Sequence, residues 1–224
     1  MALSEFPEGH SAAILSINER KIECKLLGVA KEKVRGVAII CHPHPLFGGT
    51  MNNKVVHTLA RAFEAKDISV LRFNFRGVGR SDGEHAGGMG ELADLRGLIA
   101  WVESRLPGLP VYLAGFSFGA FVVASYAAEA QRSPASLVRL FLVAPPVHHY
   151  NMDKIKSVCC PVTVIFGLED EVVPAEQMLA WSDRLAEGTS VHTMAAATHF
   201  FHGHLTALKK LLVDELALNE VESM

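Results

Sequence analysis

The chain has 224 residues, half of them apolar, and a formal net charge of −3 at pH 7. This length and composition suit one large α/β domain over 1–224, and the absence of basic runs argues against nucleic acid as a partner. No apolar run approaches the length of a membrane span, and the N-terminal residues lack the pattern of a secretion signal, so we expect a cytoplasmic protein that does not associate with membranes.

Short apolar runs alternate with segments of helical periodicity along the chain. The first two runs, Ser11–Ile17 and Ile22–Leu27, are joined by a polar turn and predict a pair of strands. Further strands are expected at Val37–Ile40, Ile68–Phe73, Pro110–Ala114, Leu140–Val143, Val162–Phe166 and around Val191–Ala195. Helices are expected near Lys54–Lys66, Glu91–Arg105, Phe118–Ala130, Ala175–Leu185 and Leu205–Leu218. Almost purely apolar strands are typical of sheets covered on both faces, so the order predicts an α/β fold with a mostly parallel, doubly wound sheet.

The residues after the predicted strand at 110–114 form the pattern Gly115-Phe116-Ser117-Phe118-Gly119, which leads directly into a predicted helix. Strand, tight turn and helix in this order predict a nucleophile elbow. Such a turn holds the serine in a strained conformation, and side chains at the two glycine positions would collide with neighbouring elements. The alternative is a tight turn in which Ser117 has no chemical role.

Loops at the carboxyl ends of the later strands contain the other groups that an activated serine needs. A serine hydroxyl becomes a good nucleophile when a base removes its proton, and histidine suits that role near neutral pH. His199 follows the last predicted strand, and Asp170 follows the strand before it. We therefore expect Ser117 as nucleophile, His199 as base and Asp170 as the group that orients the histidine.

Neighbouring residues offer alternatives to this assignment. Glu169 and Glu171 compete with Asp170, and His202 and His204 compete with His199. The three histidines could instead bind a metal ion, but no carboxylate or cysteine nearby completes a ligand set. The four cysteines follow no metal-binding spacing either and are interpreted as reduced thiols (Cys24, Cys41, Cys159 and Cys160). We expect neither a metal nor any other cofactor.

Acyl transfer also requires main-chain N–H groups that stabilise the developing oxyanion. One is expected from Phe118, which follows the nucleophile, and the other from the loop after the strand at 37–40. In the Pro43-His44-Pro45 segment only His44 has an N–H group, so we predict an oxyanion hole formed by His44 and Phe118, with Leu46 as second choice for the loop donor. His42 is expected to support this loop.

At this point the chain resembles the α/β-hydrolase superfamily, in which nucleophile, acid and base occur in the order Ser, Asp, His. The resemblance covers residues from about 36 to 212. It includes the G-x-x-D-x-x-V-P pattern at Gly167–Pro174 and the R-G-x-G-x-S pattern at Arg76–Ser81. The His-Pro-His-Pro loop and the short length are most similar to small lidless carboxylesterases and dienelactone-hydrolase-like proteins. Dienelactone hydrolases use a cysteine at the elbow, where this chain has Ser117.

The segment in which many members of this superfamily carry a lid is short here. Residues 144–160 separate two predicted strands, too few for a helical cap. An uncapped site suits small or accessible esters, and aromatic and proline residues near it are expected to form the substrate pocket (Phe47, Phe116, Pro146 and Tyr150).

The predicted function is hydrolysis of small carboxylic esters through an acyl-enzyme. A thioesterase or an acyltransferase would use the same groups, whereas a peptidase normally needs a gating domain for which this chain has no room. From another class, a binding protein could retain the fold without turnover. A homodimer in which a partner subunit covers the site is an open alternative.

Overall fold

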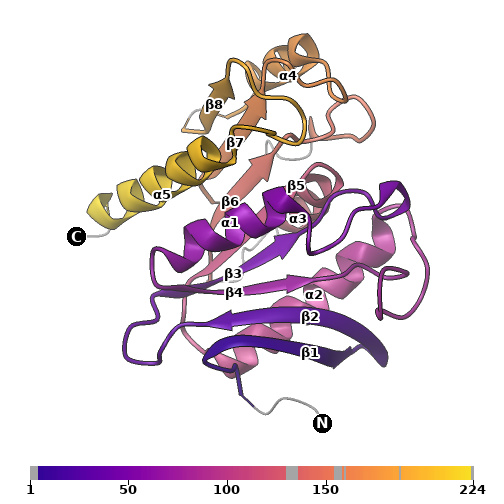
Figure 1. Ribbon diagram of the computed structural model, residues 1–224, viewed down its shortest axis with the longest axis vertical. Coiled ribbons are helices and arrows are strands. Elements are labelled where there is room, and N and C mark those ends of the chain that lie inside the picture. The colour runs from indigo at the N-terminus through magenta and orange to yellow at the C-terminus, as the bar shows by residue number, and fades with distance from the viewer. Residues whose placement is uncertain (1–4, 130–135, 154–157, 159, 187, 223–224) are drawn as a thin grey trace.

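Eight strands form one twisted sheet in the computed structural model, which describes residues 5–129, 136–153, 158, 160–186 and 188–222 (Figure 1). The strand order across the sheet is β1-β2-β4-β3-β5-β6-β7-β8. The strands are β1 (Gly9–Ile17), β2 (Arg20–Gly28), β3 (Gly36–Cys41), β4 (Ile68–Phe73), β5 (Val111–Phe116), β6 (Leu137–Val143), β7 (Val162–Gly167) and β8 (Ser190–Met194).

The strands from β3 to β8 run in one direction, which β1 shares, and β2 alone runs the other way. β1 pairs with β2 and β2 with β4 in antiparallel fashion, while all other pairs are parallel. The turn between β1 and β2 places Asn18 and Glu19 at φ 49° and 65°. The prediction of a mostly parallel sheet is therefore confirmed, and β5 extends two residues further than predicted, to Phe116.

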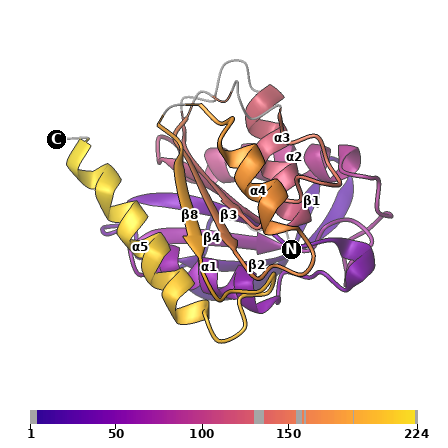
Figure 2. The ribbon, with the colours of Figure 1, turned by 90° about the horizontal axis from the view of Figure 1, so that it is seen from above.

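Helices cover both faces of the sheet, as predicted. α1 (Lys54–Glu64) and α5 (Leu205–Glu222) pack on one face, and α2 (Met89–Arg105), α3 (Phe118–Glu129) and α4 (Ala175–Ser182) belong to the core on the other (Figure 2). A single turn of 3-10 helix, η1 (Pro45–Phe47), follows β3. The predicted end of the third helix, Ala130, lies outside the described residues.

The central strands are apolar on both sides because each contributes to two cores. In β3, Val37, Ile39 and Cys41 belong to the core under α2 and α3, whereas Ala38 and Ile40 belong to the core under α1 and α5. All six residues of β3 are buried. Successive side chains of a strand point to opposite faces, so this continuous apolar run requires helices on both sides.

A buried polar cluster joins α5 to the sheet. Arg139 of β6 forms an ion pair with Glu215 of α5, and its Nε donates to Thr163 Oγ1 of β7 at 3.0 Å. Thr163 Oγ1 donates to Glu215 Oε2 at 3.0 Å, and His192 Nε2 of β8 lies 2.9 Å from Glu215 Oε1. Glu215 thus connects α5 with three neighbouring strands.

Two of the predicted free thiols are seen in the interior. Cys24 and Cys41 are buried and outside any disulfide, and burial raises the pKa of each thiol well above its ordinary value. Cys159 lies outside the described residues.

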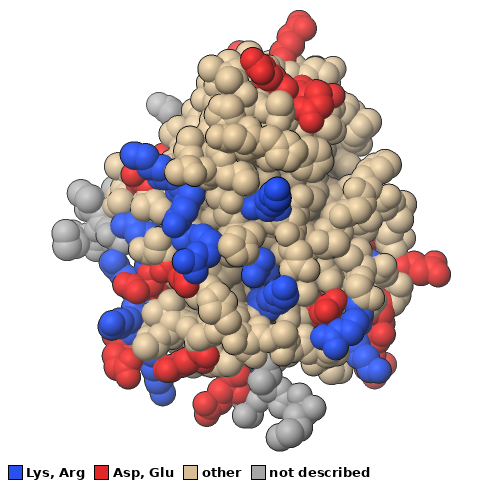
Figure 3. Space-filling model, viewed as in Figure 1, with Lys and Arg blue, Asp and Glu red and all other residues tan. Residues whose placement is uncertain are grey.

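Within the described part of the chain, no helix is long and apolar enough to cross a membrane. On the face seen in Figure 3, Lys and Arg side chains are interspersed with Asp and Glu side chains.

Candidate active site

Loops after three strands bring Ser117, His199 and Asp170 into one hydrogen-bonded chain. Ser117 follows β5, Asp170 follows β7 and His199 follows β8, so all three lie at the carboxyl edge of the parallel sheet. His199 Nε2 lies 3.1 Å from Ser117 Oγ, and His199 Nδ1 lies 2.8 Å from Asp170 Oδ2. All three residues are buried. The structure thus brings together the three residues predicted as nucleophile, base and orienting acid.

The turn that carries Ser117 has the geometry of a nucleophile elbow. Ser117 has φ 53°, in the left-handed region, and its N–H donates to Val143 O at 2.8 Å. A Cβ at Gly115 would lie 2.2 Å from Gly119 O, and a Cβ at Gly119 would lie 2.3 Å from Cys41 O. Both contacts are with main-chain atoms that cannot rotate away. The two glycines therefore allow the strand, the helix and β3 to approach closely enough to form the turn.

The Asp170 carboxylate is held by the loop that contains it. Its Oδ1 accepts hydrogen bonds from the N–H groups of Val172 and Val173 at 2.8 and 2.7 Å, which leaves Oδ2 for His199. When Nδ1–H of His199 donates to Asp170, the other ring nitrogen is free to accept the Ser117 proton. The arrangement can therefore activate a serine hydroxyl by general-base catalysis.

The rival acids and bases occupy other positions. Glu169 is exposed, and Glu171 Oε2 accepts the main-chain N–H of His199 at 3.0 Å, so Glu171 holds the histidine loop. His202 is exposed, and the His204 Nδ1 atom lies 3.0 Å from the carbonyl oxygen of His202. Among the described residues, no group of three His, Cys, Asp or Glu side chains is placed to hold a metal ion. No motif predicts the contact between Glu171 and the His199 loop. The only indication in the sequence is that Glu171 follows Asp170.

The predicted lining residues divide into buried and accessible ones. Phe116 is 0% exposed, and its ring centroid lies 5.1 Å from that of His199, so it supports the histidine from the interior. The expectation that Phe116 contacts substrate is corrected, because its side chain belongs to the core on the α1 and α5 face. Phe47 is 87% exposed. Pro146 is buried in a turn, and Tyr150 is partly exposed and packs on Phe118.

The two predicted oxyanion donors lie in adjoining segments. Phe118 is the first residue of α3, so its N–H has no acceptor within the helix. The ring of His44 lies 5.0 Å from that of Phe118, and the main-chain N–H of His44 has no acceptor among the described residues. Leu46, the second choice, donates its N–H to His44 Nδ1 at 3.2 Å. The geometry thus favours His44 over Leu46 as the loop donor.

His42 fixes the start of this loop from the interior. Phe75 N–H donates to His42 Nε2 at 3.0 Å, so the ring proton is on Nδ1, which lies 2.6 Å from the carbonyl oxygen of Pro43. Burial lowers the pKa of His42 from about 6.5 to about 4, and the ring is therefore neutral near pH 7. It links the loop after β3 to the loop after β4, in the supporting position expected from the sequence.

Additional histidines surround the site. The ring of His85 lies 4.7 Å from that of His44, and His85 Nδ1 is 2.9 Å from Glu91 Oε1 without the alignment of a hydrogen bond. Burial, followed by the nearby His85, lowers the pKa of His44. Burial also lowers the pKa of His148, and His148 lies close enough to Asp170 and His199 for electrostatic interactions with them to contribute to its pKa. The sequence analysis did not identify His85 or His148, because neither belongs to a spaced motif.

Comparison with known proteins assigns the chain to the same class of proteins as its fold does. Residues 32–158 match the model of the family described as serine aminopeptidase, S33. An α/β serine hydrolase homologue from Coxiella burnetii has 37% sequence identity and a TM-score of 0.87, covering 95% of this chain and 100% of that chain. An α/β serine hydrolase without lid from Xanthomonas campestris has 34% identity and a TM-score of 0.83, covering 94% of each chain. A monoacylglycerol lipase of Mycolicibacterium smegmatis is 28% identical over 64% of this chain and 49% of the lipase.

The fold, the elbow and these similarities define a serine hydrolase of the α/β type. The chain belongs to the α/β-hydrolase superfamily, in its lidless branch. The short connection between β6 and β7 fits this placement, because residues 144–161 are too few for a cap domain.

Proposed function

We propose that the protein is a serine esterase that cleaves small carboxylic esters through an acyl-enzyme intermediate. The observation that carries this proposal is the hydrogen-bonded chain from Ser117 through His199 to Asp170 at a glycine-pinched elbow. The similarity to a monoacylglycerol lipase, an enzyme named for ester substrates, supports the ester class.

In acylation, Ser117 Oγ attacks the ester carbonyl carbon while its proton passes to His199 Nε2. The carbonyl oxygen becomes an oxyanion that the N–H groups of Phe118 and His44 stabilise. The tetrahedral intermediate collapses, the C–O bond to the alcohol breaks, and the His199 proton moves to the departing oxygen. The Asp170 carboxylate stabilises the imidazolium formed between these two transfers.

In deacylation, His199 removes a proton from water as its oxygen attacks the acyl carbon. Collapse of the second intermediate releases the carboxylic acid and returns the proton to Ser117 Oγ. The same acyl-enzyme reacts with an alcohol or a thiol in an acyltransferase, and forms from a thioester in a thioesterase. These activities use the same catalytic groups of the protein. They differ in the acceptor that reacts with the acyl-enzyme and in the leaving group of the substrate.

A fluorophosphonate probe tests the nucleophile, because it phosphonylates an activated serine. We expect labelling at Ser117 and none in Ser117→Ala. Glu169→Gln and His202→Ala are matched controls for Asp170 and His199, and should retain labelling and ester hydrolysis. A folded wild-type protein that does not react with the probe would contradict the proposal and favour a binding protein.

Substrate class is tested in the same preparation with p-nitrophenyl esters, acyl thioesters and aminoacyl anilides. The anilides are included because the matching family model carries an aminopeptidase description. We expect the oxygen esters to be hydrolysed fastest. Turnover of the anilides without turnover of the esters would refute the esterase proposal in favour of a peptidase.

A further inference from the structure

Glu91, in the first turn of α2, is a fully buried carboxylate outside the predicted catalytic triad. Its Oε1 accepts the N–H of Ala86 at 2.9 Å, and its Oε2 accepts the N–H of Gly88 at 2.8 Å. A carboxylate loses its hydration on burial and is retained where hydrogen bonds replace the lost water. Glu91 therefore fixes the conformation of the turn that leads into α2.

The loop after β4 holds the part of α2 on which Glu91 lies. Arg76 Nε and Nη2 donate to Asp94 Oδ2 and Oδ1 at 2.8 Å each, and both side chains are largely buried. A Cβ at Gly90 would lie 2.0 Å from Arg76 Nη1, so the arginine packs directly against the start of the helix. The R-G-x-G-x-S pattern, which begins at Arg76, thus anchors the helix that carries the Glu91 carboxylate.

His85 directly precedes the turn that Glu91 fixes, and its ring contacts the rings of both predicted oxyanion donors. The ring centroid of His85 lies 4.7 Å from that of His44 and 5.3 Å from that of Phe118. The rings of His44 and Phe118 are themselves 5.0 Å apart, so the three rings form one cluster. The other ring neighbour of His44, Phe47, is largely exposed. His85 and Phe118 therefore provide the firm packing surface for the His44 ring.

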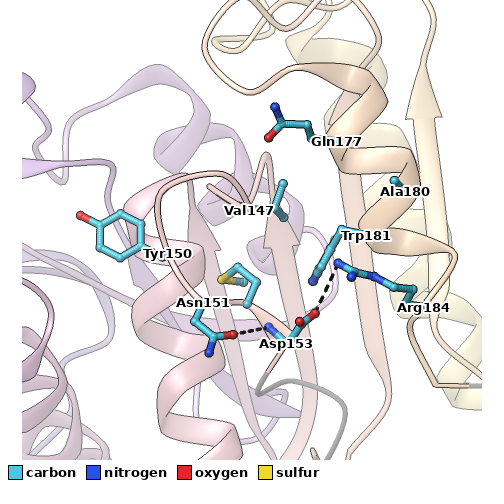
Figure 4. A pocket seen from close by; sticks show the side chains of 9 residues that line it. Val147, Tyr150, Asn151, Asp153, Gln177, Ala180, Trp181 and Arg184 are labelled. Atoms are coloured by element: carbon cyan, nitrogen blue, oxygen red, sulfur yellow. Dashed lines mark hydrogen bonds and ion pairs between the residues drawn. The ribbon is translucent and has the colours of Figure 1, made fainter.

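Phe118 has supports that do not involve His85. It is the first residue of α3, and its ring packs on that of Tyr150 with centroids 5.6 Å apart. Tyr150 also lines a cavity of about 540 Å³ between the loop after β6 and α4, and in Figure 4 its hydroxyl points away from the other labelled residues. The cavity lining, which includes Trp181, contains none of the predicted catalytic residues or oxyanion donors. The cavity is therefore connected to the site only through Tyr150.

His44 depends more strongly on its side-chain contacts, because it lies outside the strands and α-helices, between two prolines. Its N–H belongs to the same peptide unit as the carbonyl group of Pro43, which lies 2.6 Å from His42 Nδ1. This contact holds one end of the peptide unit from the interior. Packing of the His44 ring on His85 holds the other end, and the two contacts together define the direction of the His44 N–H.

We propose that His85 is a positioning residue of the oxyanion hole: placed by the Glu91 turn, its ring packs on His44 and keeps the His44 N–H directed at the developing oxyanion. The inference rests on the proposed function, because the oxyanion forms only when Ser117 attacks a substrate. The alternative is that Glu91 is a helix cap without influence on the site. Loss of a whole oxyanion donor costs about 10²–10³ in kcat, and a misdirected donor should cost about tenfold.

Substitutions at position 85 separate ring packing from polarity. His85→Phe keeps an aromatic ring, His85→Asn keeps a polar group without the ring, and Glu84→Gln at an exposed neighbouring position is the control. With p-nitrophenyl butyrate we expect His85→Asn to lower kcat about tenfold at unchanged KM, and the other two variants to stay near the wild type. Urea unfolding establishes that all are folded in the assay. Wild-type kcat in His85→Asn, or equal losses in His85→Asn and His85→Phe, would refute the packing role.

The His44 N–H can be observed directly, because Pro43-His44 is the single Pro-His pair in the sequence. Labelling with carbonyl-carbon-13 proline and nitrogen-15 histidine therefore gives one carbonyl-to-amide NMR correlation. A trifluoromethyl ketone adds to Ser117 Oγ, the serine proton passes to His199, and the ketone oxygen becomes an oxyanion. We expect this adduct to move the His44 amide proton downfield in the wild type and in His85→Phe, and much less in His85→Asn. Equal shifts in the three proteins would refute the positioning role.

The contribution of Glu91 is tested with Glu91→Gln. Glutamine has one acceptor oxygen where the two oxygens of Glu91 each accept an N–H group, so one of these groups loses its partner. We expect a lower kcat and a smaller shift of the His44 amide proton, as in His85→Asn. Wild-type kcat in folded Glu91→Gln would refute placement of His85 by the carboxylate.

Failure of this proposal is distinguishable from failure of the proposed function. If the wild type hydrolyses no ester and forms no adduct with the ketone, the function is wrong. If the wild type does both and His85→Asn equals it in kcat and in the His44 shift, the function stands and the positioning role of His85 is refuted.

Discussion

Acidification from pH 7 to pH 5 should weaken the fold through His42, the buried ring that holds the loop after β3. Its Nε2 accepts the N–H of Phe75, and a protonated ring cannot accept that bond. Burial, the largest contribution, lowers the pKa of His42 from about 6.5 to about 4 in the folded protein. The unfolded chain therefore takes up a proton at His42 at a higher pH than the folded protein does.

The sign and size of the effect follow from this difference in pKa. Because the unfolded state binds more protons between pH 6.5 and pH 4, stability is complete above that window and falls as the pH decreases through it. The whole difference corresponds to about 3 kcal/mol, of which roughly 2 kcal/mol are lost between pH 7 and pH 5. Below the folded pKa the contribution becomes constant.

Urea unfolding at a series of pH values measures this effect, with His42→Gln as the matched variant. Glutamine keeps an oxygen acceptor for the Phe75 N–H and removes the titrating ring. We expect the free energy of unfolding of the wild type to fall about 2 kcal/mol more than that of the variant between pH 7 and pH 5. Parallel pH profiles would show that His42 is not held neutral by the fold.

Three further predictions concern the site. Ser117→Ala and His199→Ala should each lower ester hydrolysis by several orders of magnitude and Asp170→Asn somewhat less, with little change in unfolding midpoint; a loss of activity matched by a loss of fold would contradict a chemical role. Gly119→Ala should destabilise the protein by about 3 kcal/mol or more in denaturant titrations, because the new methyl group meets the main chain of Cys41; unchanged stability would contradict the close packing of the elbow. In a p-nitrophenyl ester series from two to sixteen carbons, rates should be highest for acyl chains up to about six carbons, because an uncapped pocket cannot remove a long chain from water. A maximum at twelve carbons or beyond would indicate a covering surface.

The sequence predicted the parts of this molecule that depend on local pattern. The apolar strands, the helices between them and the glycines of the elbow each have a signal within a few residues, and the structure contains all of them. The rule that function collects at the carboxyl ends of parallel strands then placed Asp170 and His199 beside Ser117 without any knowledge of distances.

Features that depend on side-chain direction or on packing between loops could not be predicted in this way. Phe116 lies next to Ser117 in the sequence, yet strand alternation turns it into the core under His199. Glu171 contacts His199 through a main-chain N–H, which no residue pattern encodes. The cavity at Trp181 requires the relative position of α4 and the loop after β6, which depends on tertiary packing.

The polar cluster around Glu215 has a consequence for how the protein opens. Detachment of α5 would leave the Arg139 cation buried without its carboxylate partner, so this helix and strands β6 to β8 should exchange their amide hydrogens as one cooperative unit. The loop with His199 runs between β8 and α5, inside that unit. A substitution at Glu215 is distant from the reacting atoms. If it lowers activity, the cause would therefore be more frequent opening of this unit.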